Sequence, residues 1–126
     1  MAACADKVGV ATILVAEDDS GMREWLAEVL QAAAYRVLTA EDGLRARSLA
    51  NLHSPDLVIT DISMPHEEGL GLIRAMRSAH PQTKIIVISG KDPDTLDDAK
   101  LLGAHATLQK PIGGHELLQA IRDLLT

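Results

Sequence analysis

The sequence predicts an α/β fold with five helices covering both faces of a doubly wound sheet of five parallel strands. Two observations predict this class. Short apolar runs alternate along the chain with longer segments whose apolar residues recur at helical spacing. Runs that are apolar at consecutive positions are typical of parallel strands buried on both faces. At 126 residues the chain has the length of one domain, and strict alternation implies right-handed crossovers.

The first predicted strand covers residues 12–16, and a helix begins near Ser20, with Asp19 or Ser20 as its N-cap. The apolar positions of this helix follow one another at intervals of three and four: Met22, Trp25, Leu26, Val29, Leu30 and Ala33. The second strand is expected at 36–39. A second helix should begin near Asp42, with Leu44, Leu49 and Leu52 as its apolar positions, and Ser54-Pro55 should end it.

The third strand is predicted at 57–60, before a helix at 68–78 that stops at His80-Pro81. The apolar positions of that helix are Leu70, Leu72, Ile73 and Met76. A β-branched strand follows at 84–88, and a weaker helix at 94–102 ends at Gly103. The last strand and helix are expected at 106–109 and 114–125. Residues 1–11 are expected to form a tail, so the domain covers 12–126.

Composition and charge exclude several classes of protein. The formal net charge of −6 argues against direct binding of nucleic acid, which requires a basic face. No apolar segment reaches the ~20 residues of a membrane span, and the N-terminus lacks the pattern of a secretory signal. A single cysteine, Cys4, cannot form an internal disulfide, so we expect a cytoplasmic protein. The histidines have no metal-ligand spacing and are expected at the surface: His53, His66, His80, His105 and His115.

Charged residues stand where three of the predicted strands end. Glu17, Asp18 and Asp19 follow the first strand, Asp61 follows the third, and Lys110 follows the fifth. Ligands of such sheets bind outside the carboxyl ends of the strands, so these groups should meet at one edge. Converging carboxylates and one ammonium suit a hard cation and a phosphoryl group. The alternative interpretation is that the acids only cap turns and helices, as Asp19 is expected to do.

Four motifs in order give the chain a specific resemblance. They are residues 13–19 (ILVAEDD), 61–65 (DISMP) with Gly69 after them, 87–90 (VISG) and 108–111 (LQKP). Each motif alone is weak, but together they resemble the receiver domain of response regulators in two-component signalling, of the chemotaxis-regulator kind. The resemblance covers 12–126 and implies a flavodoxin-like (βα)5 fold.

The resemblance implies a phospho-acceptor and a metal site. Asp61 would accept the phosphoryl group. Asp18 and Asp61 would bind Mg²⁺ or Mn²⁺ directly, Glu17 would act through a water, and Ser63 would offer its backbone carbonyl. These positions also have a chemical reason that does not depend on the family. A carboxylate and a phosphoryl group are both anionic, and a divalent cation between them removes their repulsion.

The resemblance also implies phosphoryl-binding residues and a switch. Lys110 and Ser89 would contact phosphoryl oxygens, and Pro111 would follow a cis peptide bond that aims the lysine. A shift of Ser89 would repack the surface of the fourth helix, fifth strand and fifth helix. Two departures stand out, because Thr107 replaces the usual aromatic switch residue and Ile112 replaces a common Phe. Gly90 leaves the edge of the site open.

The favoured function is that of a signalling phospho-acceptor rather than an enzyme. Its partners would be a histidine kinase or histidine phosphotransfer protein and a downstream protein target. A stand-alone regulator and a receiver separated from its output domain both remain open, and phosphorylation-dependent dimerisation is compatible with either. The alternative is a metal-dependent phosphatase or phosphotransferase with an aspartyl nucleophile, disfavoured because Ser63 stands where such enzymes need a second acid. A flavodoxin is disfavoured because acidic residues at 17–19 would repel its phosphate.

Overall fold

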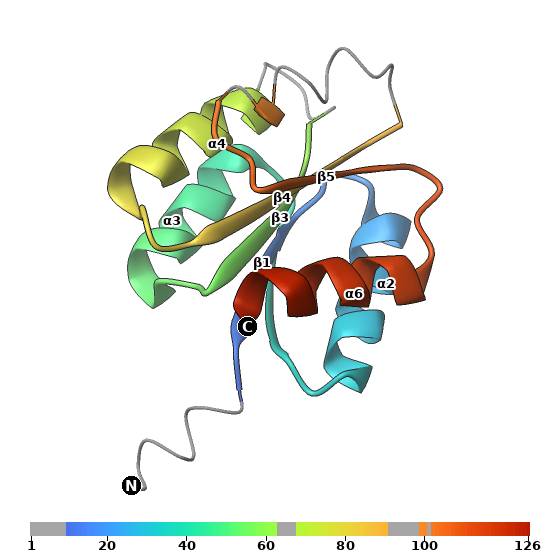
Figure 1. Ribbon diagram of the computed structural model, residues 1–126. Helices are drawn as coiled ribbons and strands as arrows, with labels where there is room; N and C mark the ends of the chain where they lie inside the picture. The colour runs from blue at the N-terminus through green and yellow to red at the C-terminus, as the bar shows by residue number, and fades with distance from the viewer. Residues whose placement is uncertain (1–9, 63–67, 91–98, 101) are drawn as a thin grey trace, which may run out of the picture.

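The computed structural model describes residues 10–62, 68–90, 99–100 and 102–126. These residues contain one sheet of five strands in the order β2-β1-β3-β4-β5, shown in Figure 1. All four neighbouring pairs are parallel, which confirms the predicted fold class. The strands are β1 (Thr12–Ala16), β2 (Arg36–Ala40), β3 (Leu57–Asp61), β4 (Lys84–Ser89) and β5 (Ala106–Gln109).

Among the described elements, two pairs of helices cover the two faces of the sheet (Figure 1). One face carries α2 (Ser20–Ala32) and α6 (Gly114–Leu125), and the other carries α3 (Gly43–His53) and α4 (Glu68–Ala79). The helix expected at 94–102 falls mainly on 91–98 and 101, which lie outside the described residues, although 99 and 100 are helical. Among the described helices, none has the length and apolar character that crossing a membrane requires.

Adjacent residues of the inner strands supply two separate cores. In β1, Ile13 and Val15 pack with α2 and α6, whereas Leu14 and Ala16 pack with α3 and α4. Successive side chains of a strand point to opposite faces, so a strand covered on both faces must be apolar throughout. This arrangement explains the uninterrupted apolar runs in the sequence. It also leaves the ends of the strands as the places where charged residues can stand.

The apolar positions expected for α3 were partly wrong. Leu44 and Leu52 are 72% and 75% exposed, while Ala46 and Ala50 are fully buried. The small side chains let this helix lie close to the sheet and to α4, so the longer leucines point into solvent. Only Leu49 of the three expected leucines packs against the core.

His105 is partly buried rather than a simple surface residue. Its backbone N–H donates to the Ile85 carbonyl at 2.8 Å, and its ring Nδ1 accepts from the Ile85 N–H at 3.0 Å. The side chain thereby extends the β4–β5 ladder by one residue before β5 begins. Burial, followed by the charges of Lys84 and Arg77, lowers the pKa of His105.

Candidate functional site

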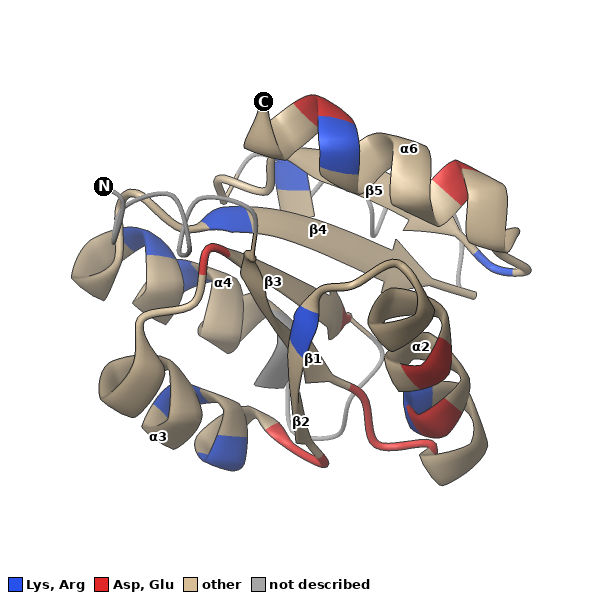
Figure 2. Ribbon diagram, turned by 90° about the horizontal axis from the view of Figure 1, so that it is seen from below, with Lys and Arg blue, Asp and Glu red and all other residues tan. Residues whose placement is uncertain are grey.

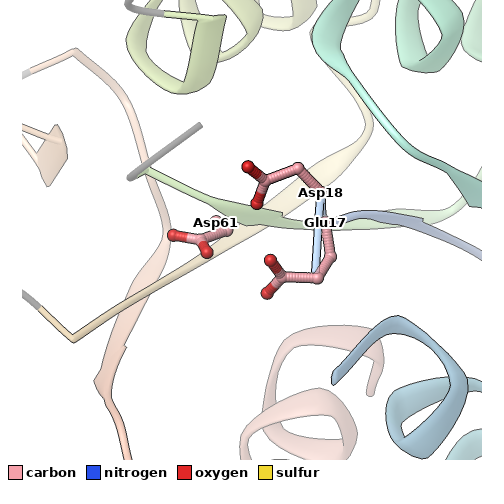
Figure 3. A group of neighbouring side chains, drawn as sticks. All are labelled: Glu17, Asp18 and Asp61. Carbon is pink, nitrogen blue, oxygen red and sulfur yellow. The ribbon is translucent and has the colours of Figure 1, made fainter. Parts of the chain in front are cut away.

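The carboxyl edge of the sheet brings together the acids that follow β1 and the acid that ends β3. Because Ala16 pairs with Thr60, Glu17 lies beside Asp61. Figure 2 shows the acidic connection that leads from β1 into α2. One carboxylate oxygen from each of Glu17, Asp18 and Asp61 lies within 4.8 Å of the other two. In Figure 3 these carboxylates, carried by two strand ends, point toward a common space.

The acids differ sharply in exposure. Glu17 is fully buried and Asp61 is 3% exposed, whereas Asp18 is exposed at the rim of the site. Glu17 is fixed at its backbone, because its N–H donates to the Ala40 carbonyl at 3.0 Å. Its Oε2 accepts from the Asp19 N–H at 3.1 Å. The Asp19 side chain caps α2 by accepting from the Met22 N–H at 2.7 Å, so the expected cap is confirmed.

Lys110 places a positive charge between two of these acids. Its Nζ donates to Asp61 Oδ2 at 3.0 Å and to Glu17 Oε1 at 3.3 Å. Its backbone N–H donates to the Ser89 carbonyl at 2.8 Å. The Lys110–Pro111 peptide bond, expected to be cis, is cis. The ammonium therefore takes a position where it can neutralise part of the carboxylate charge.

Burial and mutual charge shift the protonation of this group. Burial is the largest cause that raises the pKa of Glu17, from 4.5 to about 7, and Asp61 adds to the rise. The Asp19 N–H and the charge of Lys110 oppose it. For Lys110, burial disfavours the ammonium, but the hydrogen bond and charge of Asp61, helped by Glu17, raise its pKa overall. A raised carboxyl pKa beside an ammonium paired with carboxylates is typical of charged groups crowded in a partly buried site.

The other expected site residues are placed as follows. Ser89 is buried at the end of β4, next to the strand that carries Asp61. A Cβ added at Gly90 would lie 3.7 Å from Lys110 Cδ, so this glycine adjoins the lysine stem. Thr107 lies on β5 beside Val87 and is partly buried. Ser63 lies outside the described residues.

One residue of the site was missed by reasoning from sequence. Arg23, in the first turns of α2, donates from Nη1 to the backbone carbonyl of Glu17 at 2.8 Å. A contact of 3.5 Å joins the same nitrogen to the Asp18 carbonyl. The spacing of apolar residues identifies position 23 only as a polar position of the helix. A hydrogen bond to the backbone carbonyl of a residue six positions earlier cannot be recognised from residue types.

The donor set fits a hard divalent cation. Mg²⁺ prefers carboxylate oxygens completed by water and carbonyl ligands, and Ca²⁺ usually demands more protein oxygens. Glu17, Asp18 and Asp61 offer clustered carboxylates with no sulfur or imidazole among the three. These residues could therefore hold Mg²⁺ or Mn²⁺ beside the Asp61 oxygens.

A parallel five-stranded α/β sheet with clustered acids at its carboxyl edge is typical of one class of signalling domain. The chain belongs to the response regulator receiver domain family, whose sequence model matches residues 13–122. The resemblance drawn from the four motifs is thus confirmed. Receiver domains are modules of two-component systems, in which response regulators partner with histidine kinases.

Individual relatives agree with this assignment. The chain is 36% identical over 110 residues to the transcriptional regulatory protein PdtaR of Mycobacterium tuberculosis, covering 86% of this chain and 54% of that protein. It is 38% identical over 114 residues to the response regulator MprA of Mycobacterium sp. strain KMS, covering 90% and 50%. The chain therefore spans about half the length of these relatives. The solved structure of the Vibrio cholerae chemotaxis protein CheY4 is similar, with a TM-score of 0.85, 30% identity, and coverage of 91% and 98%.

Proposed function

We propose that Asp61 accepts a phosphoryl group in a His-Asp phosphorelay. The donor would be a phosphohistidine of a histidine kinase or histidine phosphotransfer protein. The observation that supports the proposal most directly is the convergence of three carboxylates within 4.8 Å, with Lys110 hydrogen bonded to Asp61. An isolated capping acid would need neither the neighbouring acids nor the lysine.

The chemistry follows from the charges of the reacting groups. A carboxylate oxygen of Asp61 would attack phosphorus as the bond from phosphorus to the histidine nitrogen breaks, which leaves an acyl phosphate. Asp18 and Asp61 would hold Mg²⁺ or Mn²⁺ directly, Glu17 through a water, and Ser63 through its carbonyl. When bound, the ion would lower the repulsion between carboxylate and phosphoryl oxygens.

Two further residues, Lys110 and Ser89, would bind oxygens of the phosphoryl group. Lys110 donates to Asp61 Oδ2 in this structure, and its ammonium would donate to a phosphoryl oxygen after transfer. The Ser89 hydroxyl would donate to another oxygen, and its shift would repack the surface that includes β5 and α6. Thr107 lacks an aromatic ring, so this repacking would not use the aromatic switch of many relatives.

In the proposed role the domain is a signalling component rather than an enzyme that turns over an external substrate. Residues 12–126 would form the receiver, and the signal would pass to a downstream protein or to an output domain of the same protein. The net charge of −6 supports a protein target rather than direct contact with nucleic acid. A cytoplasmic location would give access to the kinase.

The test is phosphorylation by acetyl phosphate with Mg²⁺, followed by intact mass. The parent should gain one phosphoryl group, whereas Asp61→Asn should gain none. Asp56→Asn is a matched control, because Asp56 lies at the opposite end of β3 and binds the Thr12 N–H. Equal labelling of parent and Asp61→Asn would overturn the proposal.

A further inference from the structure

The connection between β1 and α2 carries two of the three clustered carboxylates. Its first residue is anchored by the bond from the Glu17 N–H to the Ala40 carbonyl, 3.0 Å long. Its last residue, Asp19, is anchored by capping α2. Successive side chains of an extended chain point in opposite directions. The adjacent carboxylates of Glu17 and Asp18 can therefore meet only if contacts hold the backbone between these anchors in a particular conformation.

The side chain of Arg23 is hydrogen bonded to the backbone between these two anchors. The 2.8 Å bond from its Nη1 to the Glu17 carbonyl has good length, while the 3.5 Å contact with the Asp18 carbonyl is at the limit of a hydrogen bond. The Arg23 N–H also donates to the Asp19 carbonyl at 2.9 Å, as part of the helix start. One residue of α2 thus contacts the main chain of all three residues of the connection.

An arginine suits this role better than a lysine. The guanidinium is a rigid fork of donors that stays charged at all relevant pH values. Because its donors are directed to carbonyl oxygens, the positive charge stays beside the acidic connection without drawing a carboxylate away from the cation site. A lysine ammonium is a compact, mobile charge that would favour a carboxylate instead.

We propose that Arg23 is a positioning residue for the cation site, acting through the backbone of Glu17 and Asp18. This inference rests on the proposed function, since it assigns how that site is held. For the change in Mg²⁺ affinity on removing Arg23, the positioning role and a purely electrostatic role predict opposite signs. Removing a nearby positive charge should tighten Mg²⁺ binding if Arg23 acts only as a charge, whereas loss of positioning should weaken it.

The experiment is calorimetric titration of the metal-free domain with MgCl₂. Arg23→Gln should bind Mg²⁺ about 10-fold more weakly than the parent, as expected for loss of a group that orients metal ligands. Arg47→Gln removes the same charge from an exposed position on α3 and should change the affinity less than about twofold. Unchanged or tighter binding by Arg23→Gln would overturn the inference.

A second readout separates positioning from general damage. The rate of labelling by acetyl phosphate should require more Mg²⁺ in Arg23→Gln yet reach the parent's plateau at saturation. If Arg23→Gln fails to unfold cooperatively in urea, Arg23→Lys replaces it in the titration. The Lys variant should also bind Mg²⁺ more weakly than the parent. Parent-like Mg²⁺ affinity of the Lys variant would overturn the role assigned to the guanidinium. Two other results would instead contradict the proposed cation site itself. One is that the parent does not bind Mg²⁺, and the other is that Asp18→Asn binds Mg²⁺ as tightly as the parent.

Discussion

The ammonium of Lys110 lies 3.0 Å from Oδ2 of Asp61 and connects the end of β5 to the end of β3 across the intervening strand. The Asp61 side chain is 4% exposed and that of Lys110 is 27% exposed, so this ion pair is only partly hydrated. The pair neutralises the acid that we assign as the phospho-acceptor. The lysine is therefore a stabilising partner of the site, and in the proposed function it would also donate to a phosphoryl oxygen.

Replacing Lys110 with Met should destabilise the domain in the presence of chelator. The change leaves two buried carboxylates without their ammonium, at a cost of about 1–3 kcal/mol in the free energy of unfolding near neutral pH. The loss should shrink near pH 5, because Glu17 then takes up a proton. Urea unfolding of parent and variant at both pH values checks this, and an equal loss at both would contradict it.

Glu17 should make the metal-free domain less stable as the pH rises. Its folded-state pKa of about 7 exceeds the ordinary 4.5, so the folded protein holds this proton more tightly than the unfolded chain does. The resulting stabilisation is full below pH 4.5 and is lost as the pH rises through about 7. Relative to Glu17→Gln, the parent should lose on the order of 1–3 kcal/mol of unfolding free energy across that window.

Chemical denaturation of parent and Glu17→Gln across this pH range, in chelator, measures the effect. Saturating Mg²⁺ should flatten the difference, because a bound cation favours the ionised carboxylate. A difference between the two proteins that does not change with pH would mean that Glu17 keeps an ordinary pKa in the folded state.

Asp18→Asn should respond differently to chelator and to magnesium. In chelator it relieves repulsion among the clustered acids, and because Asp18 is exposed the gain should be at most about 1 kcal/mol. Mg²⁺ binds the folded arrangement only, so it should stabilise the parent much more than the variant. Equal shifts of the urea midpoint in both proteins on adding Mg²⁺ would show that Asp18 is no ligand.

His105 should confer a separate sensitivity to acid at the other end of β5. Its folded-state pKa is lowered, so the folded protein binds this proton less tightly, and the stability it contributes is lost as the pH falls below its ordinary 6.5. Protonation of Nδ1 would remove the acceptor of the Ile85 N–H. His105→Asn supplies an uncharged acceptor and should unfold with less dependence on pH below 6.5 than the parent. Identical acid profiles would contradict this role.

The fold and most of the site could be predicted from sequence because both depend on local patterns. Strands buried on both faces are apolar throughout, so Glu17, Asp61 and Lys110 mark strand ends, and parallel strands present those ends at one edge. What failed depended on packing between elements. The leucines of α3 were expected inside, but the close approach of this helix to its neighbours selects Ala46 and Ala50 for the core.

Two other residues show a second limit of sequence patterns. Arg23 and His105 act on backbone groups, through the Glu17 carbonyl and the Ile85 N–H respectively. Every residue offers a backbone carbonyl, and every residue but proline offers an N–H, so the sequence does not show which of these groups a side chain binds. Only the folded geometry distinguishes these two side chains from ordinary surface arginines and histidines.

The most direct test of the account is to locate the phosphoryl group itself. Domain treated with acetyl phosphate is reduced with borohydride, which converts an aspartyl phosphate to homoserine, and then digested with trypsin. Peptide 48–74 contains both Asp56 and Asp61, so one spectrum compares the assigned acceptor with an internal control. We predict homoserine at position 61 alone, and only when Mg²⁺ is present. Conversion at position 56 or 18, or equal conversion at 61 in chelator, would contradict the assignment of Asp61 as a cation-dependent phospho-acceptor.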